Sequence, residues 1–182
     1  MTDDIKWAGI DVAREGDDLS VFTVREGSRV IYIDSWGKTN EMETAGIILL
    51  KLERFGIEDK HVNIDAMPAG VYDRLRELKH YVNGIIFGGT AKDPDHYINI
   101  RAEMYDNLRK RFEEGTISIP DDHFLIAQLT GIRFKIASDR KLQIISKDEM
   151  KHTYHLNSPD KADSLALCFY EPEIKNPQIR WL

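Results

Sequence analysis

The stretch Trp7-Ala8-Gly9-Ile10-Asp11 has the pattern of a short, buried β-strand whose last residue is an acid. A second stretch, His61-Val62-Asn63-Ile64-Asp65, has the same design. Because successive side chains point to opposite faces of a strand, each aspartate should face away from the isoleucine before it. If the strands are parallel neighbours, both carboxylates lie at the carboxyl edge of the sheet, where open α/β sheets place their sites. The two stretches therefore predict a pair of acids, Asp11 and Asp65, at one sheet edge.

A third acid, Asp163, ends the stretch Ser158-Pro159-Asp160-Lys161-Ala162-Asp163, in which Ser158 is expected to cap a helix. The helix that follows, to about residue 170, is apolar almost all round, which indicates burial. An ionised aspartate in such a helix needs a partner, and Asp160 lies three residues earlier on the same face. Carboxylates brought this close repel one another unless a cation joins them, and oxygen-rich acid clusters suit Mg²⁺ or Mn²⁺.

We therefore expect Asp11, Asp65 and Asp163 to be catalytic acids that meet in space and hold divalent metal, with Asp160 as a further metal ligand. Two ions about 4 Å apart could activate a water and stabilise the leaving oxygen of a phosphodiester. For each acid taken singly, a structural role stays open. An aspartate at a strand end is often a turn or cap residue, and Asp160 in a first helical turn is favoured by the helix dipole alone.

Length and composition restrict the class of protein and its domain organisation. The chain has 182 residues, of which 42% are hydrophobic and 31% charged, as in an ordinary soluble domain. We expect one domain over residues 1–172 and a tail over 173–182. The single Cys168 excludes an internal disulfide and a multi-cysteine zinc site. No apolar run is long enough for a membrane span, and the acidic N-terminus is not a signal peptide, so we expect no membrane partner and an intracellular protein.

The formal charge of −6, from 25 basic and 31 acidic residues, argues against a nucleic-acid surface spread over the whole molecule. It leaves room for a local basic track beside an acidic, metal-filled site, because bound metal cancels the charge of the carboxylates.

Hydrophobic periodicity predicts the order of the elements. Strands are expected at 7–11, 19–25, 29–36, 61–65 and 84–87, a brief strand at 117–119, and a hairpin from 132–137 and 142–145. Helices are expected at 40–55, 68–80, 99–114, 121–129, from 146 onward, and 158–170. Three antiparallel strands followed by strand–helix alternation is the pattern of the ribonuclease H-like fold. We therefore expect an α/β domain with a central mixed five-stranded sheet, helices on both faces and an additional β-hairpin.

At these residues the chain resembles the C-terminal nuclease domain of the large terminase subunit of tailed bacteriophages. The stretches that carry the resemblance occur in the family's order and span nearly the whole chain; singly each is weak, and as an ordered set they are specific. They are Gly9-Ile10-Asp11-Val12-Ala13-Arg14-Glu15-Gly16-Asp17-Asp18, Ile64-Asp65, Ala69-Gly70-Val71-Tyr72-Asp73-Arg74-Leu75, Asn99-Ile100-Arg101-Ala102-Glu103-Met104-Tyr105, Ser146-Lys147-Asp148-Glu149-Met150-Lys151 and Ser158-Pro159-Asp160-Lys161-Ala162-Asp163-Ser164-Leu165.

The resemblance implies a metal-dependent endonuclease that cuts concatemeric double-stranded DNA during genome packaging in the cytoplasm of the infected bacterial host. By motif, Asp11, Asp65 and Asp163 match the family's catalytic acids, with Asp160 close by. The implied partners are double-stranded DNA, an N-terminal ATPase domain of the same full-length protein, the portal and the small terminase subunit. The ATPase is expected to lie outside this chain, because Gly88-Gly89-Thr90-Ala91-Lys92 lacks the spacing of a phosphate-binding loop.

Seven basic residues are candidates for contact with DNA. Arg101, Lys147 and Lys151 fall in the matching stretches, whereas Arg133, Lys135, Arg140 and Lys141 cluster on the second hairpin. A basic hairpin beside an acidic site could guide DNA. It could equally be a charged edge that blocks aggregation, and the three helix residues could be solvated charges.

Two other functions remain open. Another ribonuclease H-like nuclease, such as a Holliday-junction resolvase, would carry a similar set of acids. A non-catalytic docking domain of the packaging motor would use the acids only to stabilise its fold. Metal binding at the acid cluster separates a nuclease from a docking domain.

Overall fold

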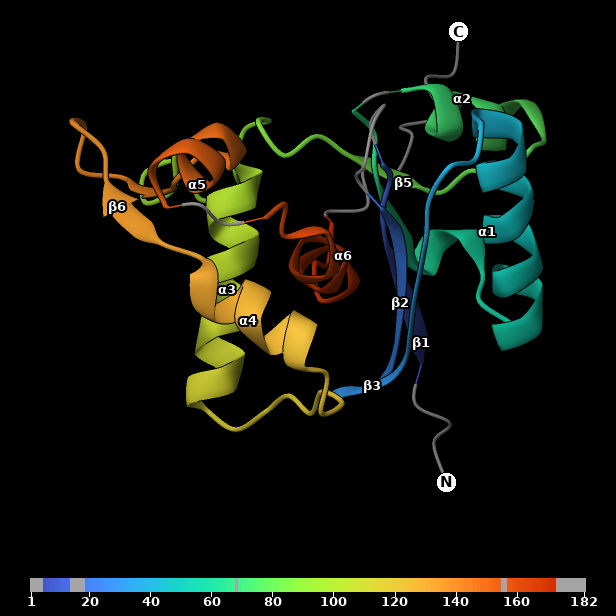
Figure 1. The fold of residues 1–182 in the computed structure, drawn as a ribbon, viewed down its shortest axis with the longest axis horizontal. Coiled ribbons are helices and arrows are strands. Elements are labelled where there is room, and N and C mark those ends of the chain that lie inside the picture. The colour runs from blue at the N-terminus through green and yellow to red at the C-terminus, as the bar shows by residue number, and fades with distance from the viewer. Residues whose placement is uncertain (1–4, 14–18, 68, 155–156, 173–182) are drawn as a thin grey trace, which may run out of the picture.

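The structure, a computed structural model, describes residues 5–13, 19–67, 69–154 and 157–172. Its centre is a five-stranded mixed sheet with the strand order β3-β2-β1-β4-β5, and helices cover both faces (Figure 1). The sheet strands are β1 Lys6–Asp11, β2 Ser20–Glu26, β3 Arg29–Trp36, β4 Val62–Asp65 and β5 Asn83–Ile85. The predicted architecture is confirmed.

Strand β1 is the central strand and pairs in both directions. It runs antiparallel to β2, which runs antiparallel to β3, so the predicted opening meander is present. On its other side β1 runs parallel to β4, and β4 runs parallel to β5. In the β1–β4 pair Ile10 lies opposite Ile64, so the aspartates that follow these residues end neighbouring strands at the same edge.

One face of the sheet is covered by α1, Glu41–Phe55, and α2, Gly70–Glu77. Buried side chains of these helices pack against Ile10, Phe22 and Ile64 of the sheet. Helix α1 begins at the predicted cap, where Asn40 and Glu43 exchange hydrogen bonds, and it ends at Gly56 in the left-handed conformation. A short 3₁₀ turn, η1 Asp59–His61, leads into β4.

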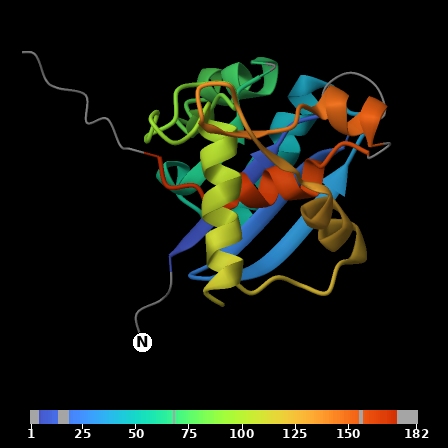
Figure 2. The same ribbon diagram turned by 90° about the vertical axis from the view of Figure 1, so that its left-hand side faces the viewer.

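The other face is covered first by α6, Asp160–Cys168, and then by the elements outside it (Figures 1 and 2). These outer elements are α3 Ile100–Glu113, α4 His123–Gly131, α5 Lys147–Thr153 and the separate hairpin of β6 Phe134–Ile136 and β7 Leu142–Ile144. The hairpin projects at the end of the molecule farthest from α1 (Figure 1). Helix α6 is therefore enclosed between the sheet and an outer layer, as its apolar sequence predicts.

Several predicted boundaries differ from the structure. The predicted strand at 117–119 is only a single bridge between Ser118 and Arg29. The helix expected to reach residue 80 ends at Glu77, and Leu78 beyond it is 42% exposed. Pro159, not Ser158, occupies the cap position of α6, because the Ser158 hydroxyl instead hydrogen-bonds the Asp160 carboxylate.

The predicted tail, residues 173–182, lies outside the described residues. Within the described ranges, no helix is both long enough and apolar enough to cross a membrane.

Candidate active site

The contact between α6 and β1 places the first turn of α6 over the carboxyl end of the strand. The Ser164 hydroxyl lies 2.9 Å from the Gly9 carbonyl oxygen, and further along α6 the Cys168 sulfur lies 3.4 Å from the Trp7 carbonyl oxygen. The helix thus runs antiparallel to β1. A Cβ atom on Gly9 would lie 2.2 Å from backbone atoms of Ser164 and Cys168, so only glycine allows this approach.

Asp11 and Asp65 face α6 from the sheet, as strand alternation predicts. Asn63, two residues before Asp65 and on the same face, donates hydrogen bonds of 2.8 and 2.6 Å to the carbonyls of Leu167 and Tyr170. Both aspartates are buried, and Asp65 Oδ1 accepts a 3.0 Å hydrogen bond from the Met67 amide. The predicted pair of acids at one edge of the sheet is therefore present.

Asp163 is fully buried, and its two carboxylate oxygens have different surroundings. Oδ1 accepts hydrogen bonds from the Tyr105 hydroxyl at 2.7 Å and from Nε and Nη2 of Arg101 at 3.3 and 3.2 Å. Oδ2 makes no hydrogen bond of good geometry among the described residues, although Lys147 Nζ lies 3.0 Å away as an ion pair. The donors on α3 thus hold Oδ1, whereas Oδ2 faces the Lys147 ammonium.

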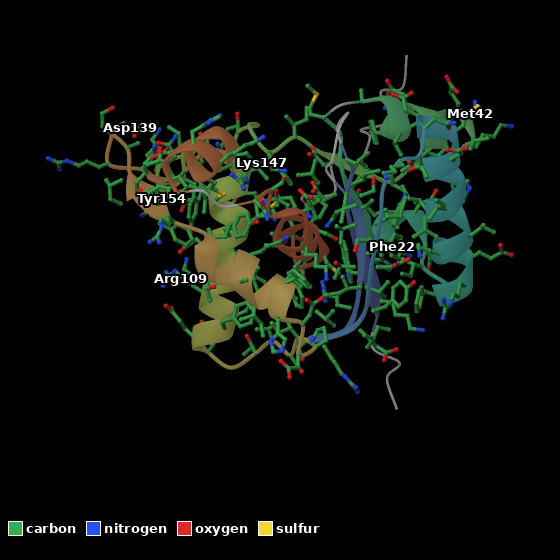
Figure 3. The ribbon with its side chains drawn as sticks, in the orientation of Figure 1. Phe22, Met42, Arg109, Asp139, Lys147 and Tyr154 are labelled. Atoms are coloured by element: carbon green, nitrogen blue, oxygen red, sulfur yellow. The ribbon has the colours of Figure 1, made fainter. Side chains whose placement is uncertain are left out.

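Asp160 belongs to the same cluster and is also buried. Its Oδ2 accepts a 3.2 Å hydrogen bond from the Leu19 amide, and Lys147 Nζ lies 3.9 Å from its Oδ1. The structure thus brings all four predicted acids into one electrostatic group, with the Lys147 ammonium among them. In Figure 3, Lys147 lies between α5 and the end of the sheet.

The charges in this group act strongly on one another. Burial, followed by repulsion from Asp163, Asp160 and Asp65, raises the pKa of Asp11 well above its ordinary value, against the pull of Lys147. Burial also acts to raise the pKa of Asp163, but Arg101 and Lys147 outweigh it and hold that pKa below the ordinary value. Burial opposes the charge of Lys147 too, yet attraction to Asp163 and Asp11 raises its pKa. A group of acids balanced this way without metal favours an added cation.

The carboxylates of the cluster are the groups that could hold a divalent metal. In the described part of the chain, no three His, Cys, Asp or Glu side chains converge closely enough, as they lie, to share one ion. Lys147 supplies the counter-charge in this arrangement. The chemistry nevertheless fits Mg²⁺ or Mn²⁺, because the donors are carboxylate oxygens and a buried one, Asp163 Oδ2, is held among the described residues only by the charge of Lys147 and by no hydrogen bond of good geometry.

The predicted role of Arg101 needs correction. Its side chain is buried, and its guanidinium is used by Asp163 and by the Ile145 carbonyl, so it does not meet the predicted phosphate contact. Lys147 contacts the acid cluster rather than standing as a solvated helix charge. Lys151, one turn later on α5, is exposed and stays a candidate for DNA contact.

The basic hairpin keeps its charges at the surface. Lys135 pairs with Glu149 at 2.8 Å, and Lys141 pairs with Asp139 at 3.4 Å. Arg133 and Arg140 are exposed, with the Arg133 guanidinium over the Tyr154 ring. Asp139 marks the tip of the hairpin in Figure 3. Half of the predicted cluster is thus partly neutralised by nearby acids.

Tyr105 is a site residue that was not among the predicted catalytic or binding residues, although it lies in one of the stretches that carry the resemblance. A signal exists in hindsight: Arg101 and Tyr105 are four residues apart, so they share one face of a helix and can reach the same carboxylate.

Comparison with known proteins is consistent with this geometry. No family model and no curated protein sequence matches the chain. The nuclease domain of the large terminase subunit gp2 of bacterial virus Sf6 superposes with a TM-score of 0.80 at 21% identity, covering 94% of this chain and 90% of that one. A mutant of that domain, solved with manganese and β-thujaplicinol, gives 0.79 at 20% identity with the same coverage. The large terminase nuclease from thermophilic phage G20c with bound magnesium gives 0.68 at 16% identity, covering 92% and 81%.

The sheet order and the helices on both faces give this chain a ribonuclease H-like α/β fold. Within that class, it has the fold of the nuclease domains of phage large terminase subunits.

Proposed function

We propose that this chain is a divalent-metal-dependent endodeoxyribonuclease that cleaves concatemeric double-stranded DNA during phage genome packaging, with little sequence specificity. The observation that carries the proposal is the single electrostatic group formed by four buried aspartates at the carboxyl edge of parallel strands β1 and β4. The shared fold supports it, because similar domains have been solved with manganese and with magnesium.

Asp11, Asp65 and Asp163 are the proposed catalytic acids, and with Asp160 they would hold two Mg²⁺ or Mn²⁺ ions. Bound metal would supply Lewis acidity and lower the pKa of a water. The remaining work falls to the chain itself. Tyr105 and Arg101 fix the orientation of Asp163, and Lys147 balances the acids when metal is absent.

DNA would reach this site along the exposed cations of α5 and the hairpin. Lys151, Arg133, Lys135, Arg140 and Lys141 are the proposed phosphate contacts, which position DNA without reading its sequence. The full protein would act in the cytoplasm of the infected bacterium. Its proposed partners are an N-terminal ATPase domain of the same protein, the portal and the small terminase subunit.

Digestion of supercoiled plasmid tests the proposal. With Mg²⁺ or Mn²⁺ the protein should cut the plasmid, and EDTA should stop the reaction. Asp11→Ala, Asp65→Ala and Asp163→Ala should each abolish cutting while thermal melts still show a folded protein. Asp73→Ala, at an exposed position on α2, is the control and should cut normally.

Full activity in any one of the three variants would remove that residue from the catalytic set. Cleavage in EDTA would rule out metal dependence, and failure to bind Mn²⁺ would favour a docking domain. Preference for a four-way junction over linear duplex would indicate a resolvase instead.

A further inference from the structure

Helix α4 has an apolar surface without a partner in the described part of the chain. Its sequence, His123–Gly131, is apolar over most of its length, yet Leu125 is its one buried side chain. Phe124 is 75% exposed and Ile126 is 39% exposed. A helix that is apolar all round is normally covered, so an exposed ring such as Phe124 marks a candidate contact surface on α4.

A cavity of about 220 Å³ opens beside this surface. Phe124, Ala127 and Gln128 of α4 line it together with Met150 of α5 and with Asn157 and Pro159, which lead into α6. Small-molecule sites usually measure about 300–1,000 Å³, so this hollow suits one planar group and not a whole cofactor.

The hollow adjoins the acid cluster. Pro159, in its wall, directly precedes Asp160 in the chain, and Met150 lies one turn after Lys147. Helix α4 is fastened to the start of α6, because Asp122 pairs with Lys161 at 2.5 Å and Gln128 Oε1 accepts a 3.1 Å hydrogen bond from the Ala162 amide. Figure 2 shows α4 (gold) and α5 (orange) on either side of α6 (red) at this end of the molecule.

We propose that this hollow binds a nucleobase of the DNA strand beside the phosphodiester that the aspartates cleave, with Phe124 stacking on the base. The inference rests on the proposed function. The position of the hollow beside the acid cluster favours nucleic acid as the occupant, because Pro159 in its wall directly precedes Asp160. Stacking on an aromatic ring accepts any base, which agrees with cleavage of little sequence specificity. The Lys161 ammonium, which pairs with Asp122, lies 5.6 Å from the centre of the Phe124 ring.

A base that enters the hollow must leave the DNA stack, which costs free energy and costs least where the duplex is already unpaired. The wild-type protein should therefore cut a duplex with a short mismatched bubble faster than a fully paired duplex. This preference should depend on Phe124.

Binding is measured in EDTA, where no cleavage occurs, with a single-stranded oligonucleotide that contains a fluorescent adenine analogue. Phe124→Leu should weaken binding about tenfold and lose the quenching of the analogue. Ala127→Leu, which fills the hollow from an exposed helical position, should have the same effect. Phe112→Leu is the matched control, because Phe112 is a partly exposed phenylalanine on α3 outside the hollow, and it should bind normally.

Cleavage in Mn²⁺ of paired and bubble duplexes then separates this inference from the proposed function. If both hollow variants cleave the two duplexes as the wild type does, the base-binding role of the hollow is wrong and the proposed nuclease activity stands. If binding depends on Phe124 but the wild type does not cleave DNA, the proposed nuclease activity is wrong and the base-binding role of the hollow stands. If the variants change only the oligomeric state in sedimentation, the surface binds protein and the inference is wrong.

Discussion

The Tyr105 hydroxyl donates a 2.7 Å hydrogen bond to Oδ1 of Asp163, and both side chains are buried between α3 and α6. Burial, and then the nearby Asp163 charge, raise the pKa of Tyr105 well above its ordinary value, so the phenol remains a donor throughout the physiological range. The donor fixes which oxygen of Asp163 is left for a metal. Tyr105 is thus a positioning residue that acts through the carboxylate.

Replacing Tyr105 by phenylalanine should reduce cleavage about 10- to 100-fold, as is typical when a group that orients a metal ligand is lost. The fold should lose only about 1 kcal/mol, because Arg101 still satisfies Asp163 Oδ1. The expected signature is a higher Mn²⁺ requirement in plasmid digestion. Tyr81→Phe, at an exposed position, is the control and should change neither activity nor melting temperature. Unchanged Mn²⁺ dependence in Tyr105→Phe would exclude the positioning role.

Asp11→Asn should abolish cleavage and yet stabilise the metal-free protein at neutral pH. The pKa of Asp11 is raised in the folded state, so the unfolded chain gives up its proton first as pH rises from the ordinary value of 3.8. The fold therefore loses stability above that pH, until Asp11 is ionised in the folded state too. The asparagine variant lacks this loss. Urea denaturation in EDTA across pH 4 to 8 should show the difference between variant and wild type growing with pH.

When Mn²⁺ replaces EDTA in the urea denaturation, the wild type should become more stable than Asp11→Asn. Mn²⁺ should bind the folded wild type and not the variant, which lacks the Asp11 carboxylate. A wild type that is more stable than Asp11→Asn at neutral pH in EDTA would contradict the raised pKa.

Lys147→Met tests whether the ammonium and the metal compete for the same acids. Without metal, the free energy of unfolding of the variant should be about 1–2 kcal/mol lower than that of the wild type. This is a small loss for an ion pair with a buried acid, because the Lys147 side chain is 40% exposed. With the positive charge removed, Mn²⁺ should bind roughly tenfold more tightly in titration calorimetry. Lys151→Met, one turn later on α5 and exposed, should leave both quantities unchanged. Weaker Mn²⁺ binding in Lys147→Met would mean that the lysine assists the metal.

The sequence predicts the acids better than it predicts their neighbours, for a physical reason. The positions of Asp11 and Asp65 follow from local strand alternation together with one assumption, that their strands are parallel neighbours. The pairing of Arg101 with Asp163 instead depends on how α3 docks on α6, which no local pattern specifies. The start of α6 also differs from the prediction, because the Ser158 hydroxyl binds the Asp160 carboxylate and does not cap the helix.

Gly9→Ala should destabilise the protein by about 3 kcal/mol or more, because the new methyl group would meet the backbone of α6 and backbone cannot move aside as a side chain can. Since α6 carries Asp160 and Asp163, cleavage should fall as well. Gly46→Ala is the matched control, because Gly46 lies at an exposed position inside α1 and its added Cβ meets nothing within 4 Å. It should gain about 0.5–1 kcal/mol through helix propensity. Urea denaturation measures both changes, and a neutral Gly9→Ala would refute the close contact.

The basic hairpin should hold DNA through its phosphates. Changing Arg133, Lys135, Arg140 and Lys141 together to glutamine should lower cleavage at moderate salt without changing Mn²⁺ binding. Each phosphate contact contributes about −0.9 to the slope of log affinity against log salt. Because Lys135 and Lys141 already pair with Glu149 and Asp139, the slope should become shallower by the equivalent of about two phosphate contacts and not four.

The control for the hairpin variant removes four cations on the α1–α2 side of the molecule: Arg54, Lys60, Arg76 and Lys79. Both variants take the formal charge from −6 to −10, so a general charge effect would weaken them equally. The hairpin variant alone should lose cleavage if the hairpin touches DNA. Plasmid nicking across a salt series, with EDTA as the blank, measures this. Equal losses in the two variants would mean that the hairpin is only a charged edge, and discrete sequence-specific bands would mean that base contacts, not phosphate contacts, position the DNA.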